Sequence, residues 1–209
     1  MTHTKREDRV IDWTYPEPTG AGSKFFGPGA TTAELVIQQV FPYTFGLFLP
    51  VLAYLKGWGW TWYQCVAAAL LGCDMLGGVM TNATSAAKRW YHRDEQTFWN
   101  HMSFTATHIL QPLVLMACFD RWNWCFVAVS YGYLLVASVV ILTSPQYLQR
   151  PIAMLLLVVG IFISLYVIPA PVHFEWFLPL FYIKLLCCHL LIEEPYRPKR
   201  EEREVKKEE

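Results

Sequence analysis

The segment 73–93, CDMLGGVMTNATSAAKRWYHR, carries polar residues at helical spacing inside and just after an apolar run. At about 100° per residue, one helix face would hold Asp74, Gly78, Thr81, Ser85 and Arg89. An acid in a low-dielectric site is suited to hold a proton and to deliver it to a substrate. The segment therefore predicts a functional polar face on one helix that continues as far as Arg89.

Three neighbouring side chains extend the chemistry of this face. Asn82 is suited to polarise a carbonyl group or to orient a water molecule. The guanidinium groups of Arg89 and Arg93 are suited to hold a phosphate or carboxylate head group. We expect Asp74 and Asn82 in catalysis and the two arginines in substrate binding.

Three other apolar segments carry polar residues at a similar depth. Helical spacing places two or three such residues on one face of each segment: Glu34 and Gln38; His101, Thr105 and His108; and Tyr182, His189 and Glu193. We expect His101 and His108 to act as catalytic bases, and Glu34, Gln38, His189 and Glu193 to bind substrate. The same spacing directs Lys184 to the opposite side of its helix.

These residues lie in a chain of 209 residues that is 54% hydrophobic and only 16% charged. A helix needs about 20 apolar residues to cross the hydrocarbon core of a bilayer. We predict an all-α integral membrane protein in which six transmembrane helices form one bundle. The predicted spans are 34–55, 59–81, 102–119, 123–143, 151–170 and 174–192, with a kink in the third at Pro112.

Positive charge predicts how the bundle is oriented. Of the Lys and Arg residues outside the spans, fourteen lie on the side of the two termini and only Lys56 and Arg121 on the other. Cytosolic loops carry such an excess, so both termini are expected in the cytosol. The predicted domains are a polar N-terminal segment, 1–33, a transmembrane domain, 34–192, and a charged tail, 193–209.

The chain ends in VKKEE, with Lys206 and Lys207 three and four places from the C-terminus. This ending resembles the dilysine retrieval signal of endoplasmic-reticulum membrane proteins, which a cytosolic coat complex reads. The resemblance implies residence in the endoplasmic reticulum of a eukaryote.

Four functions fit these features. The favoured one is a membrane-embedded enzyme that uses acid–base chemistry on a lipid, sterol or isoprenoid, with no cofactor and no metal ligands. Haem b electron transfer is the first alternative, with His108 and His189 as axial ligands, and a single metal ion is also left open. A small transporter and a non-catalytic assembly subunit are the others. The expected partners are the bilayer and a lipophilic substrate, and no nucleic acid.

Overall fold

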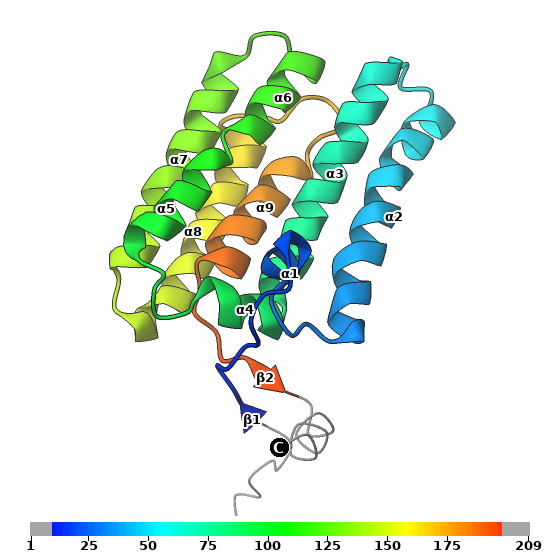
Figure 1. Cartoon of the computed structure of the whole chain (residues 1–209). Helices are drawn as coiled ribbons and strands as arrows, with labels where there is room; N and C mark the ends of the chain where they lie inside the picture. Colours follow the sequence, from blue (N-terminus) through cyan, green and yellow to red (C-terminus); the bar gives the residue numbers. More distant parts are fainter. Residues whose placement is uncertain (1–9, 198–209) are drawn as a thin grey trace, which may run out of the picture.

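The computed structural model describes residues 10–197, and most of them are helical (Figure 1). Five stretches of helix are long and apolar enough to span a membrane. They are α2 (Thr32–Lys56), α3 (Trp62–Ala83), the pair α5 (Phe98–Thr107) and α6 (Leu110–Phe119), α7 (Trp124–Thr143) and α8 (Gln146–Tyr166). The prediction of a helical protein with membrane-type spans is confirmed.

The sixth predicted span, 174–192, takes a different form. Its helix is the α-helix α9 (Phe177–Tyr182), which continues as the π-helix η1 (Ile183–His189). The segment Phe177–His189 is shorter than the roughly 20 residues that a single crossing usually needs. A turn-rich stretch around Pro171 precedes it, and Glu193 and Pro195 follow it, so the apolar helix cannot extend in either direction.

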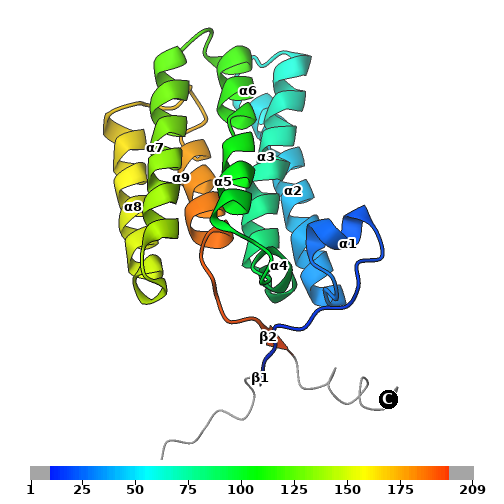
Figure 2. The ribbon, with the colours of Figure 1, turned by 60° about the vertical axis from the view of Figure 1, so that its left-hand side comes forward.

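This short helix forms the centre of the bundle. It packs against α3, α7 and α8, while α2 lies on the far side of α3 (Figures 1 and 2). Phe177, Phe181 and Leu185 have no exposed surface. Burial among the long helices therefore stabilises a helix that would be too short to be stable alone.

The third predicted span bends at a different residue from the one expected. The helix breaks at His108 and Ile109, between α5 and α6, whereas Pro112 lies within the first turn of α6. Proline has no N–H, and its ring clashes with the carbonyl group four residues earlier. The carbonyl four residues before Pro112 belongs to His108, so the proline places this histidine at the break.

The helix of the second span also ends earlier than expected. Thr84 has an extended backbone, closes α3 and caps the N-terminus of α4 (Ser85–Tyr91) by accepting a hydrogen bond from Ala87 N–H. The prediction of one continuous face from Asp74 to Arg89 is therefore wrong. Thr84 is the physical reason, because its side chain bonds to the backbone of both helices.

The same end of the bundle carries the other short elements. The helix α1 (Ala21–Phe26) lies beside α4, and β1 (Val10–Ile11) pairs with β2 (Tyr196–Arg197) in an antiparallel two-stranded sheet (Figure 2). Arg197 Nε lies 2.7 Å from Asp12 Oδ2. The first and last described segments are thus joined below the bundle. The predicted dilysine signal lies outside the described residues.

Candidate functional site

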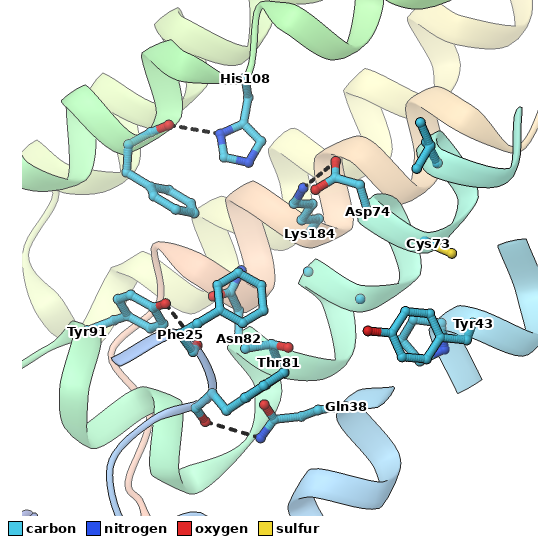
Figure 3. A pocket seen from close by; sticks show the side chains of 16 residues that line it. Phe25, Gln38, Tyr43, Cys73, Asp74, Thr81, Asn82, Tyr91, His108 and Lys184 are labelled. Carbon is cyan, nitrogen blue, oxygen red and sulfur yellow. Dashed lines mark hydrogen bonds and ion pairs between the residues drawn. The ribbon is translucent and has the colours of Figure 1, made fainter. Parts of the chain in front are cut away.

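A cavity of about 380 Å³ lies between α2, α3, α5 and η1 and is covered by α1 and α4 (Figure 3). Its walls are mainly apolar, with aromatic rings from four helices. The apolar residues that line it are Phe25, Phe26, Pro42, Tyr43, Leu70 and Phe104. Such a lining suits a lipophilic molecule, provided that the few polar groups orient it.

An ion pair between α3 and η1 forms one wall of the cavity. Lys184 Nζ lies 2.8 Å from Asp74 Oδ2, and Gln111 Nε2 donates to the same oxygen at 3.1 Å. The lysine side chain is 4% exposed and the aspartate side chain 44%. The ammonium group is therefore held inside the protein, while the carboxylate is open to a ligand.

This pair corrects the expected direction of Lys184. Ordinary α-helical spacing directs the lysine away from the face of His189. In the π-helix, hydrogen bonds join residues five apart, so Lys184 and His189 are one turn apart. Lys184 consequently reaches α3 and His189 reaches α5 from the same side of η1.

His108 faces the ion pair from the break between α5 and α6 (Figure 3). Its Nδ1 lies 2.8 Å from the carbonyl oxygen of Phe104. A carbonyl oxygen only accepts hydrogen bonds, so Nδ1 carries the proton of the neutral ring. Nε2 is then the basic nitrogen, and it is available to remove a proton from a ligand.

Amide and hydroxyl groups gather at the opposite end of the cavity. Gln38 Nε2 donates to the carbonyl oxygen of Phe26 and to Thr84 Oγ1, both at 3.2 Å. Gln38 Oε1 and Thr81 Oγ1 are buried and have no hydrogen-bond partner among residues 10–197. Asn82 lies beside them (Figure 3). Gln38, Thr81 and Asn82 are at most 5% exposed, so the protein already encloses these polar groups.

The cavity brings together some of the predicted site residues and leaves others out. Asp74, Asn82, His108 and Gln38 line it. The remaining predicted residues lie outside its lining: Glu34, Arg89, Arg93, His101, His189 and Glu193.

Two of the excluded carboxylates bond to the protein itself. Glu34 completes the capping box of α2 by accepting from Thr31 N–H at 2.8 Å, and its second oxygen accepts from Ala86 N–H at 3.0 Å. Glu193 lies 3.4 Å from both Lys88 Nζ and Arg150 Nη2. Both residues therefore stabilise the end of the bundle that carries α4.

The two predicted arginines belong to α4 and the loop after it. Arg89 is 2% exposed and lines a separate hollow with Trp13 and Tyr15. Arg93 stacks over the ring of Trp90, with 3.9 Å between its guanidinium carbon and the ring centroid. Because the helix α3 ends before Thr84, neither guanidinium group lies on the helix face that carries Asp74.

The predicted His101 and His189 form a cluster with His92 next to the cavity. His101 Nδ1 lies 3.4 Å from His189 Nε2, and His92 Nε2 lies 2.9 Å from the carbonyl oxygen of His189. Burial lowers the pKa of His92 from 6.5 to about 3, and the charges of Lys88 and His101 act in the same direction. His92 is therefore neutral at physiological pH.

Lys88 ties this cluster to the end of η1. Its ammonium group donates to the carbonyl oxygens of Cys188 and Leu191, at 2.6 and 2.7 Å. Burial lowers the pKa of Lys88 below its usual 10.5, although the charge of Glu193 opposes this shift. The lysine thus satisfies carbonyl groups that the end of a helix leaves without partners.

The histidine positions bear on the metal and haem alternatives. Within the described range, no three His, Cys, Asp or Glu side chains are placed to share a metal ion. The ring of Phe104 packs against both His189 and His108, at centroid distances of 4.0 and 4.7 Å. A haem ligated by these two histidines would have to displace that ring.

Sequence reasoning missed three residues that complete the site. Lys184 was expected to face elsewhere, and neither Gln111 nor Tyr91 was singled out. Gln111 directly precedes Pro112, and Tyr91 donates to the carbonyl oxygen of Phe25 at 3.0 Å. The basic-aromatic run 88–93 was a usable signal for Tyr91, whereas nothing in the local sequence indicates the π-helix.

The chain matches no protein-family model, no curated protein and no solved structure. The function of the cavity is therefore inferred from the side chains that line it.

Proposed function

We propose that this protein is an integral membrane enzyme that performs acid–base chemistry on a lipophilic substrate in the cavity. The observation that carries the proposal is the hydrogen bond from His108 Nδ1 to Phe104, which leaves Nε2 as the basic nitrogen of a ring that lines the cavity. The Lys184–Asp74 pair provides an ammonium group in the same cavity. A base and a cation that both face one apolar cavity are the groups that proton transfer requires.

Each group has a distinct role in the proposed reaction. His108 Nε2 removes a proton from the substrate. The Lys184 ammonium stabilises the negative charge that develops, and a low dielectric constant strengthens this interaction. Asp74 stabilises the ammonium form of Lys184 and holds it in place. In this ion pair the lysine carries the proton and the carboxylate does not, so Lys184 is the proposed proton donor. Gln38 and Asn82 form the far end of the cavity.

We further propose that the chain crosses the membrane six times, with both ends on the cytosolic side. The short helix supports this arrangement, because it runs from the end where His173 stacks on Trp58 to the end where Lys88 binds the Cys188 carbonyl group. The pairing of β1 with β2 is consistent with two ends on one side. The excess of Lys and Arg on that side assigns it to the cytosol.

The proposed location is the endoplasmic reticulum of a eukaryote, and it depends on the dilysine ending. Lys206 and Lys207 would be recognised by a coat complex, since short C-terminal addresses are read by receptors. Replacing both lysines with serine should move the protein to later compartments in cell imaging. An unchanged distribution would contradict this location.

The catalytic proposal can be tested without a known substrate. The purified protein is placed in nanodiscs that contain a total membrane lipid extract, and the lipids are measured by mass spectrometry before and after incubation. The wild type should convert at least one lipid species that His108→Gln and Lys184→Met leave unchanged. His173→Gln is the matched control, because that ring stacks on Trp58 outside the cavity. Identical lipid profiles for the wild type and His108→Gln would overturn the proposal.

A further inference from the structure

A second hollow continues the cavity along the outer surface of the bundle. It is a shallow groove of about 340 Å³ between α3 and α6, and it shares Leu70 and Asp74 with the cavity. The side chains along it are apolar over most of its length, and the remaining residues that line it are Tyr63, Val66, Ala67, Leu71, Leu110, Gln111 and Val114. Cavity and groove therefore meet at one carboxylate.

The two oxygens of that carboxylate have different surroundings. Oδ2 accepts both hydrogen bonds, from Lys184 and from Gln111. Oδ1 accepts no hydrogen bond from any residue between 10 and 197, and the side chain is 44% exposed. An acceptor in an apolar setting is stabilised when a ligand donates a hydrogen bond to it.

The charge of the pair decides what kind of donor fits. Lys184 balances the charge of Asp74, so the junction is neutral as a whole. A ligand ammonium group would add a charge that the neutral pair does not balance, and a ligand carboxylate would be repelled by the aspartate. A hydroxyl group donates one hydrogen bond and adds no charge that would have to be desolvated.

We propose that the ligand is a lipophilic alcohol with a single chain. Its hydroxyl group donates to Asp74 Oδ1, and its chain lies in the groove between α3 and α6. From Asp74 to Tyr63 the groove follows α3 for about 16 Å, at 1.5 Å per residue. The hydroxyl group is then at the junction with the cavity, which also holds His108, so this inference names the substrate class of the proposed enzyme and rests on that function.

Binding can be measured with four probes that share one 16-carbon, diazirine-bearing chain and differ only in the end group: alcohol, amine, carboxylic acid and methyl ether. Each competes with the labelled alcohol for photo-crosslinking to the full-length protein in nanodiscs. A hydrogen bond to a charged group strengthens binding, so the alcohol should compete at least about tenfold better than the methyl ether. Peptide mapping should place the crosslinks on α3 and α6.

Two matched variants test the groove. Val114 and Val140 are both 40% exposed, but only Val114 lines the groove, while Val140 lies on α7. Val114→Trp should reduce crosslinking about tenfold by filling the groove, and Val140→Trp should leave it unchanged. An alcohol that competes no better than the methyl ether, or equal crosslinking in the two variants, would overturn the inference.

The same probes separate this inference from the proposed activity. His108→Gln should bind the alcohol as the wild type does, because Asp74 and the groove are intact. Selective alcohol binding without any lipid conversion by the wild type would contradict the enzyme and leave the ligand class standing. Lipid conversion without alcohol selectivity would contradict only the ligand class.

Discussion

The side chain of Lys184 lies across Gly78, in the space that a β-carbon on that glycine would occupy. The absence of a side chain at position 78 therefore allows the lysine to pass α3 and reach Asp74, one turn earlier on the same helix. The neighbouring Gly77 has a different environment, because a β-carbon there would meet Pro42 at an ordinary 3.5 Å.

These two glycines provide a paired test. Gly78→Ala should displace the lysine and lower the stability by about 1–3 kcal/mol, as overpacking usually does. Gly77→Ala should be neutral or slightly stabilising, because alanine favours a helix over glycine. Thermal unfolding in detergent, followed by tryptophan fluorescence, measures both. Equal losses of stability would contradict the close passage of Lys184 over Gly78.

The unequal burial of the ion pair predicts unequal effects of breaking it. Asp74→Leu leaves an ammonium group that is only 4% exposed without its charge partner, and should cost about 3–5 kcal/mol. Lys184→Met leaves a carboxylate that is 44% exposed and still bonded to Gln111, so its cost should be smaller. The double variant should recover much of the loss, which a double-mutant cycle quantifies. Strictly additive losses would show that the two side chains do not interact.

The burial of His92 predicts a pH dependence of stability. Its pKa is about 3 in the folded protein against 6.5 for the free side chain, because burial and the charges of Lys88 and His101 disfavour protonation. A lowered pKa means that the stabilising effect is present above pH 6.5 and is lost as the pH falls toward 3. Each pH unit below 6.5 should cost roughly 1.4 kcal/mol.

Thermal unfolding of the wild type and His92→Gln between pH 7 and pH 4 measures this effect. The variant should lose less stability than the wild type over this range, since glutamine does not titrate. Parallel curves for the two proteins would contradict the burial of a neutral His92 between Lys88 and His101.

Glu34 is expected to act on stability instead of substrate binding. Its two oxygens bond to Thr31 N–H and Ala86 N–H, at the beginnings of α2 and α4. Glu34→Ala should lower the stability by about 1–3 kcal/mol, because two backbone donors lose their acceptor. Glu17→Ala, at an exposed position, is the control and should have little effect. Normal stability of Glu34→Ala with weakened alcohol crosslinking would instead support the original role in binding.

Hydropathy alone was sufficient to predict the long helices, because a run of apolar residues has few alternatives inside a bilayer. The polar faces were harder to predict, since they depend on the rotation about the helix axis from one residue to the next. The break at Thr84 and the π-helix around Lys184 both change that rotation locally. Asp74 and Asn82 precede the break at Thr84 along α3, Gln38 lies on α2, which is continuous from Thr32 to Lys56, and His108 lies at the break after α5. These four are the predicted residues that line the cavity.

Contacts between distant segments could not be predicted from spacing in one helix. The ion pair joins residues that are 110 positions apart, and the contact between His101 and His189 spans 88 positions. A single sequence contains no signal for such pairings beyond the residue types. Lys184 was therefore found only through the packing of η1 against α3.

The sheet formed by β1 and β2 also sets an order of events during synthesis. Val10 pairs with Arg197, so this contact forms only after the last helix has left the ribosome. The chain after β1 leads to α1, whose Phe25 and Phe26 cover the cavity and bond to Tyr91 and Gln38. The cover can therefore dock as soon as α4 has been made, whereas β1 waits for β2. Synthesis thus joins the two described ends last.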